Sequence, residues 1–132
     1  MRNMTDSLMP PNSEPAIRII AMPADTNPSG DIFGGWLMSM MDMAGATVAY
    51  QRAGGRVATV AVDEIEFHSP VLVGDLVTCY AEIIRTGQTS LATKVDVWVR
   101  GRSGGEPIKV TEGVFTFVAI DDDRVPRPLP AE

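Results

Sequence analysis

Residues 24–50, ADTNPSGDIFGGWLMSMMDMAGATVAY, decide the fold of this 132-residue chain. The stretch opens with turn-forming residues, passes the pair Gly34-Gly35, and enters a long apolar run rich in Met, Leu and Ala. These residues favour a helix, and few β-branched residues interrupt them. The stretch therefore predicts a turn followed by a helix that starts at Gly34 and runs for about 17 residues, or roughly 25 Å.

Asp42 is the only formal charge between residues 32 and 51. On a helix, five residues at spacings of three, four or seven from Asp42 are small: Gly35, Ser39, Gly45, Ala46 and Ala49. A lone carboxylate in such a run is expected to lie in a restricted, dry environment, as many catalytic carboxylates do. Two interpretations stay open here. Either the small residues let a substrate approach Asp42, or they only allow close packing.

Charge and composition exclude several classes of function. Seventeen acidic residues against eleven basic ones give a net charge of −6, and no block of Lys or Arg is present, so nucleic acid is not an expected partner. The single cysteine, Cys79, excludes an internal disulfide. No signal-peptide pattern opens the sequence, which favours a cytoplasmic location. A membrane span over 32–51 is disfavoured because Asp42 lies at its centre.

The regions on either side of the helix predict one domain. Residues 1–15 are polar and proline-rich and predict a flexible arm, and residues 16–22 predict a first strand. Arg52 suits the negative end of the helix dipole, and Gly54-Gly55 suit its cap. Four strands are then predicted over 56–67, 76–85, 90–100 and 108–120, the first with a bulge near Asp63-Glu64. The domain is expected to cover 16–125, before a proline-rich tail over 126–132.

The resulting order, β-α-β-β-β-β, predicts an α+β fold. The later strands are joined by short turns and are therefore expected to be antiparallel. A single long apolar helix needs a partner face, and a curved five-stranded sheet wrapped round it supplies one. Such an open sheet has free edges, which a dimer could pair.

Several familiar catalytic sites are missing from the sequence. His68 is the only histidine and Cys79 the only cysteine, so the chain cannot assemble a His/Cys zinc site, and no metal is expected. The glycine patterns of phosphate-binding and dinucleotide-binding loops are absent. A Ser-His-Asp triad would have to use His68, which has no nucleophile motif near it.

The remaining constellation is Asn27, the Gly34-Gly35 pair and Asp42. Free N–H groups at a helix start can hold a developing oxyanion. A carboxylate can act as general base or as nucleophile, and an amide can orient a water or a carbonyl. Because Asp42 lies roughly 10–12 Å along the helix from Gly34-Gly35, an aspartate from a facing subunit can reach a carbonyl held there more easily.

Residues 27–42, NPSGDIFGGWLMSMMD, together with AMPADT before them, closely resemble the YciA-type acyl-CoA thioesterases of the hotdog-fold superfamily. The similarity continues through further segments at 55–62, 73–75, 97–99 and 115–121. It implies hydrolysis of acyl-CoA to free acid and coenzyme A, with no metal and no separate cofactor. It also implies a homodimer that assembles into a trimer of dimers. The active site would lie at the dimer interface, with Asn27 and Asp42 from opposite subunits.

Coenzyme A carries several negative charges, so local basic residues must attract it to this acidic chain. The strand after the helix is expected to follow the pantetheine arm, and the turn at 87–90 to meet the phosphates. The catalytic residues expected are Asp42, Asn27 and Gly35. The substrate-binding residues expected are Gly34, Arg56, Thr59, Val60, Arg85, Gly87, Thr89 and Ser90.

Two other functions stay open from the sequence. A thioester hydratase or dehydratase on the same fold needs a histidine beside a carboxylate, and only His68 could serve. A non-catalytic acyl-CoA sensor would bind coenzyme A thioesters without hydrolysing them. The preferred acyl chain, and whether Asp42 is base or nucleophile, are not determined by the sequence.

Overall fold

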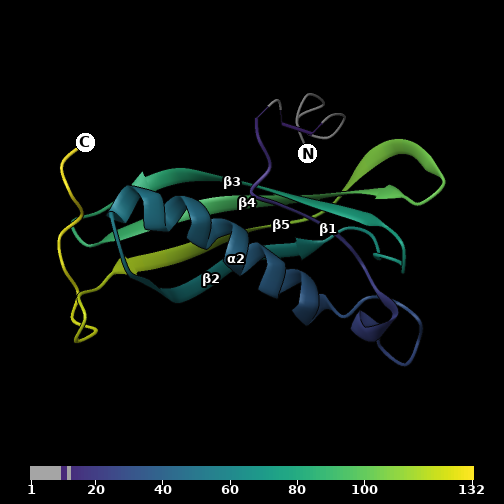
Figure 1. Ribbon diagram of the computed structural model, residues 1–132, viewed down its shortest axis with the longest axis horizontal. Helices are drawn as coiled ribbons and strands as arrows, with labels where there is room; N and C mark the ends of the chain where they lie inside the picture. Colours follow the sequence, from purple (N-terminus) through teal and green to yellow (C-terminus); the bar gives the residue numbers. More distant parts are fainter. Residues whose placement is uncertain (1–9, 12) are drawn as a thin grey trace.

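The computed structural model describes residues 10, 11 and 13–132, so most of the expected arm over 1–15 lies outside the described part. Figure 1 shows one long helix lying across one face of a single sheet. The elements in chain order are β1 (Ile17–Ile20), the 3₁₀ turn η1 (Pro23–Asp25), α2 (Gly34–Ala53), β2 (Val57–Phe67), β3 (Leu76–Thr86), β4 (Ser90–Gly101) and β5 (Gly104–Ala119). The α+β order expected from the sequence is confirmed.

The sheet has the order β1-β3-β4-β5-β2, and every neighbouring pair is antiparallel. β3, β4 and β5 follow one another through short turns. β2, however, pairs with β5 and not with β3, so residues 68–75 carry the chain from one side of the sheet to the other. This order leaves β2 at an edge of the sheet.

Helix α2 ends where its sequence predicts. Gly54 adopts the left-handed conformation, with a φ of 69°, and its N–H donates to the carbonyl of Tyr50. Glycine adopts this conformation without a steric cost, and Arg52 in the last turn complements the helix dipole. The helix thus runs to Ala53, slightly beyond the 17 residues expected.

The core lies between α2 and the sheet. Leu37, Met41, Ala44 and Ala49 of the helix are buried with Phe115 and Phe117 of β5. At Gly45 the helix packs tightly on the sheet, because an added Cβ would lie 2.8 Å from Thr93 Oγ1 and 3.1 Å from Phe117 Cε2. The small residues around Asp42 therefore fall into two groups. Gly45 and Ala49 serve packing, whereas Gly35 and Ser39 are exposed.

Strand β2 is interrupted twice. Its register against β5 shifts between Asp63 and Glu66, with Glu64 at a φ of 55°, which confirms the bulge expected there. A second shift between Thr59 and Ala61 makes Val60 an extra residue, which the sequence did not predict. The last strand also starts earlier than expected, at Gly104, because Gly101 and Gly104 pair around a two-residue turn.

The tail over 126–132 has no helix or strand, yet it is fastened to the body of the protein. Leu129 N–H donates to the Gln88 carbonyl at 2.8 Å, and its side chain packs against the core. Arg52 Nη1 donates to the Pro130 carbonyl at 2.7 Å. Among the described residues, no helix combines the length and the hydropathy that crossing a membrane requires.

Candidate active site

Asp42 projects from the middle of α2 toward β2. The Thr59 hydroxyl donates a hydrogen bond of 2.7 Å to Asp42 Oδ1, which fixes one carboxylate oxygen and leaves Oδ2 for other partners. Asp42 is half-buried and Thr59 is exposed, so the dry environment expected for the carboxylate is incomplete in the single chain. From the sequence, Thr59 was expected to bind substrate, and no connection with Asp42 was predicted. The bond to Asp42 comes from its side chain, which lies on the helix-facing side of β2.

The helix start presents unused donors. Phe33 occupies the N-cap position and makes no side-chain cap hydrogen bond. Within the described residues, the N–H groups of Gly34 and Gly35 meet neither a backbone nor a side-chain acceptor. The space beside Gly35 is open, whereas the Phe67 ring lies beside Gly34, 3.5 Å from where a Cβ would stand. This geometry is suited to holding an oxygen that develops negative charge.

Asn27 lies in the tight loop before α2. Its Oδ1 accepts hydrogen bonds from the N–H groups of Ser29, at 2.9 Å, and Asp31, at 3.1 Å. The main chain closes the same loop, since Asn27 N–H donates to the Asp31 carbonyl at 2.7 Å. Because the carbonyl oxygen of the side chain is committed to the turn, its NH₂ is the group that can donate to a substrate.

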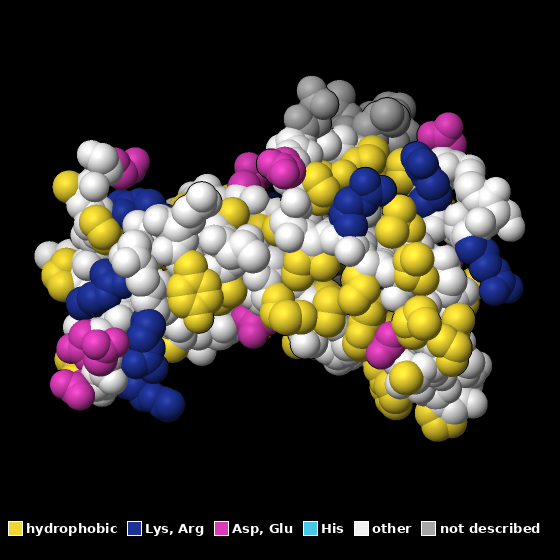
Figure 2. Space-filling model, viewed as in Figure 1, with side chains coloured by type: hydrophobic (Ala, Val, Ile, Leu, Met, Phe, Trp, Pro, Cys, Tyr) yellow, Lys and Arg dark blue, Asp and Glu magenta, His cyan; other side chains and the backbone are white. Residues whose placement is uncertain are grey.

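One face of the molecule around Asp42 is unusually apolar. On α2, Met38, Met43 and Tyr50 expose between 36% and 49% of their surface. On the free edge strand β2, Val60, Val62 and Phe67 expose between 38% and 57%. Figure 2 shows hydrophobic side chains gathered across the part of this face where Figure 1 draws α2. An exposed apolar surface beside an unpaired strand edge is typical of an interface between protein chains.

Gly34 lies at the helix start, and Thr59 and Val60 lie beside Asp42. The other residues expected to bind coenzyme A lie at the far end of the helix. The Arg56 carbonyl accepts from Ile120 N–H, and the Thr89 carbonyl accepts from Ala119 N–H, so both residues flank the end of β5. Gly87 N–H donates to the Ser90 carbonyl in the β3–β4 turn. Arg56 also faces Asp122, with 3.8 Å between Nη1 and Oδ1, and Figure 2 shows acidic and basic side chains mixed at this end. Arg85 is exposed near the end of β3.

These substrate-binding candidates are therefore separated from the helix start within one chain. Figure 1 shows that α2 begins at one end of the molecule and ends at the other, beside the β3–β4 turn. A 20-residue helix spans about 30 Å. The structure brings together Asp42 and Thr59, and separately Arg56 with the turn at 87–90, but it does not join the two groups into one pocket.

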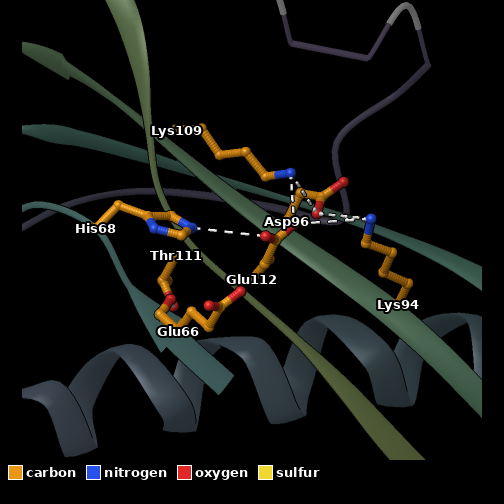
Figure 3. Close-up of polar contacts among 7 residues, drawn as sticks. All are labelled: Glu66, His68, Lys94, Asp96, Lys109, Thr111 and Glu112. Carbon is orange, nitrogen blue, oxygen red and sulfur yellow. Dashed lines mark hydrogen bonds and ion pairs between the residues drawn. The ribbon is translucent and has the colours of Figure 1, made fainter. Parts of the chain in front are cut away.

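A second polar cluster lies at the β2–β5 boundary (Figure 3). His68 Nε2 is 3.5 Å from Glu112 Oε2, and Glu112 Oε1 is 2.6 Å from the buried Lys109 Nζ. Glu66, His68 and Glu112 place their ligand atoms within 4.8 Å of one another, a grouping that the sequence analysis missed. Only the register of β2 against β5, which pairs Glu66 with Glu112, could have revealed it. Lys109 and Lys94 already balance much of its negative charge.

Comparison with known proteins identifies the family to which this chain belongs. Residues 29–105 match the model of the thioesterase superfamily. The chain is 51% identical over 126 residues to the acyl-CoA thioester hydrolase YciA of Salmonella typhimurium, covering 92% of this chain and 94% of that one. The chain therefore belongs to the thioesterase superfamily and, within it, to the YciA-type acyl-CoA thioester hydrolases.

Solved structures agree with this assignment. A hexameric thioesterase from Yersinia pestis is 54% identical, with a TM-score of 0.88, and the match covers 92% of this chain and 99% of that one. A hexameric broad specificity acyl-coenzyme A thioesterase, solved as an aspartate-to-alanine variant, is 47% identical with a TM-score of 0.87, covering 92% and 89%. The fold is thus the hotdog fold expected from the sequence.

Proposed function

We propose that this protein hydrolyses acyl-CoA thioesters to free carboxylic acids and coenzyme A, with Asp42 as the reactive carboxylate. The observation that carries the proposal is the Asp42–Thr59 pair, a carboxylate held by a hydroxyl on the exposed side of a helix whose glycine start is uncapped. Proteins about half identical to this chain are named acyl-CoA thioester hydrolases, which supports the same reaction here.

The roles follow from the chemistry of each group. The thioester carbonyl oxygen accepts hydrogen bonds from the Gly34 and Gly35 N–H groups, which stabilise the negative charge of the tetrahedral intermediate. The Asn27 NH₂ orients the carbonyl or the attacking water. Asp42 Oδ2 either deprotonates that water or attacks the carbonyl carbon directly. In both routes the carbon–sulfur bond breaks and coenzyme A leaves as its thiolate, which is then protonated.

A second copy of the chain completes this site in our proposal. Asp42 lies about 12 Å along α2 from the Gly34 N–H of its own chain, too far for both to contact one thioester carbon. The exposed apolar face of α2 and the free edge of β2 flank Asp42 and would be covered in a homodimer. The related thioesterases described above are hexameric, and three such dimers would make the same particle here.

The other functions left open by the sequence receive less support. A hydratase would need His68 beside the reacting thioester, but His68 pairs with Glu112 in the cluster of Figure 3. A sensor would have no use for a carboxylate aligned by a hydroxyl beside open N–H donors. Coenzyme A would extend from the site toward Arg56, Arg85 and the turn at 87–90 of a neighbouring chain.

The test is coenzyme A release from short-, medium- and long-chain acyl-CoAs by the wild type, Asp42→Ala and the control Asp63→Ala. Asp63 is an exposed carboxylate on the same β2 strand that holds Thr59. We expect turnover by the wild type and the control, and a loss of about two to four orders of magnitude in kcat for Asp42→Ala. Unchanged turnover in Asp42→Ala would show that the site is assigned wrongly.

Isotope labelling separates the two roles of Asp42. A single turnover in ¹⁸O-water places the label in the released acid if Asp42 is a base. If Asp42 is the nucleophile, its carboxylate forms a mixed anhydride with the acyl group as coenzyme A leaves, and water then hydrolyses this anhydride. Attack of water on the Asp42 carbon places the label in the protein and an unlabelled oxygen in the product, so label in Asp42 after one turnover requires the covalent route. Mass spectrometry of the acid and of the peptide that contains Asp42 reads both outcomes.

A further inference from the structure

A small pocket lies on the face of the sheet that α2 leaves uncovered. Side chains alternate along a strand, so Trp98 of β4 lies on the face opposite to Thr93, which meets Gly45 of the helix. The pocket has a volume of about 90 Å³, and its polar lining comes from Arg18, Thr78, Tyr80, Trp98 and Arg100. This site is therefore on the other side of the sheet from Asp42.

The strand register explains why these side chains converge. Arg18 of β1 stands opposite Thr78 of β3, which stands opposite Trp98 of β4, so the three form one row across the sheet. Arg100 follows Trp98 by two residues and Tyr80 follows Thr78 by two, which keeps both on the same face. Long arginine side chains from two strands can therefore reach over the same central Thr78 and Trp98.

Among the described residues, the polar lining consists of hydrogen-bond donors and includes no carboxylate. In the described part of the chain, neither Arg18 nor Arg100 forms an ion pair. Trp98 is only 3% exposed, and its Nε1–H meets no acceptor among the residues that the structure describes. A buried donor without an acceptor is costly and calls for a ligand or an ordered water. The Thr78 and Tyr80 hydroxyls can donate as well.

Asp96, the acidic residue that pairs with Tyr80 of the lining, is already engaged. Asp96 stands opposite Tyr80, but its Oδ1 lies 3.3 Å from Lys109 Nζ and 4.0 Å from Lys94 Nζ. Figure 3 shows both lysines directed at Asp96, in the cluster with Glu112. The positive charge of Arg18 and Arg100 is consequently not neutralised by this carboxylate, even though the whole chain carries a net charge of −6.

We propose that this pocket binds a small oxyanion of the phosphate class. A planar guanidinium group can donate two hydrogen bonds to two oxygens of one phosphate. The Trp98 N–H is a further donor among the lining residues. The pocket volume equals roughly three water molecules, enough for one phosphate group. The phosphate can be inorganic or can belong to a phosphate monoester. The pocket lies apart from the thioester site, so this inference does not rest on the proposed reaction.

The test is calorimetric titration of the full-length protein with inorganic phosphate and, separately, with glycerol phosphate. The variants are Arg18→Gln and Arg100→Gln, with Arg102→Gln as the matched control. Arg102 follows Arg100 by two residues on the same hairpin and does not line the pocket, so its removal costs the same charge. We expect roughly tenfold or weaker phosphate affinity for each pocket variant, because charge-assisted bonds are lost, and a change of less than about twofold for the control.

A spectroscopic readout keeps the test independent of folding defects in the variants. In protein labelled with fluorotryptophan, the chain gives two ¹⁹F resonances, from Trp36 and Trp98, and a Trp36→Phe variant assigns them. Phosphate should shift only the Trp98 resonance. Absence of binding by either ligand at millimolar concentration would overturn the proposal. Equal loss of affinity in Arg102→Gln, or a Trp98 resonance that does not move, would also overturn it.

Discussion

At the residue scale, the account depends on how the Asp42 carboxylate is held. Thr59 donates to Oδ1 at 2.7 Å, and Asp42 is the only charge on the middle of its helix. A carboxylate that could rotate freely would spend less time with Oδ2 directed at a water or a thioester. In our proposal, the Thr59 hydroxyl is therefore a positioning group for the reaction.

Replacing Thr59 tests this role. Thr59→Val keeps the shape of the side chain and removes the donor, so kcat for coenzyme A release should fall about tenfold, the scale of one hydrogen bond to a charged group. Thr59→Ser restores the hydroxyl and should recover most of the rate. Steady-state kinetics of both variants decide the point. If Thr59→Val and Thr59→Ser are equally active, the hydroxyl has no positioning role.

Cys79 gives a prediction about pH. It is fully buried in β3, and burial raises the pKa of its thiol to about 12. An unfolded cysteine ionises near pH 8.5, so above that pH the unfolded state binds fewer protons than the folded state. The free energy of unfolding should therefore fall as pH rises toward 12, by at most about 1.4 kcal/mol per pH unit from this group. Chemical denaturation between pH 8 and 10.5 should show a shallower decline for Cys79→Val than for the wild type. Parallel curves would contradict this.

At the scale of elements, the close approach of α2 to the sheet depends on Gly45. An added methyl group would meet Thr93 Oγ1 at 2.8 Å, and this hydroxyl already donates to the Phe115 carbonyl at 3.2 Å. The helix can be displaced only by disturbing the Phe117 ring or breaking that hydrogen bond. Packing at this position therefore limits which residues the helix can carry.

The pair Gly45→Ala and Gly35→Ala tests the packing. Gly45→Ala should destabilise the protein by about 1–3 kcal/mol, as overpacked cores do. Gly35→Ala meets open space in the same helix, so it should be neutral or stabilising by up to about 1 kcal/mol. Thermal and denaturant unfolding measure both. The explanation fails if the two substitutions have the same effect on stability.

The elements themselves were largely predictable, because their signals are local. Helix α2 follows from good helix formers between Gly34 and the cap at Gly54, and the bulge near Glu64 follows from broken alternation. The sheet order was not predictable, because the pairing of β2 with β5 is a long-range choice that no local pattern encodes. The same gap hid the Thr59–Asp42 bond, which depends on the pairing of Thr59 with Phe117 of β5.

At the scale of the whole molecule, a single chain presents an incomplete site. Asp42 lies beside an exposed apolar helix face, and β2 offers an unpaired edge with Val60 and Val62 exposed. The resemblance of residues 27–42 to the thioesterases predicted a site shared between two subunits. The length of the helix alone indicated only that an aspartate from a facing subunit could reach the helix start. In our proposal, the positions of Asn27 and Asp42 relative to each other follow from the assembly and not from either segment.

A charge on the free edge should separate the copies. Val62→Lys places a desolvated charge where two β2 edges would pair, so light scattering should show particles smaller than the wild-type assembly. Coenzyme A release should fall with the loss of assembly. Val125→Lys alters an equally apolar, exposed residue in the C-terminal segment and serves as the control. Smaller particles with full activity would contradict a site shared between chains.

The most direct test of the central claim, that Asp42 of one copy acts with Asn27 of another, is activity in mixed assemblies. Asp42→Ala and Asn27→Ala chains are each inactive in our account, and they are unfolded together and refolded at equal ratio. Half of the dimers then carry both chains, and each of these holds one intact site. Coenzyme A release should therefore recover to about a quarter of the wild-type rate, the binomial share of intact sites for two-chain sites. A mixture that remains as inactive as its two parents would contradict the claim.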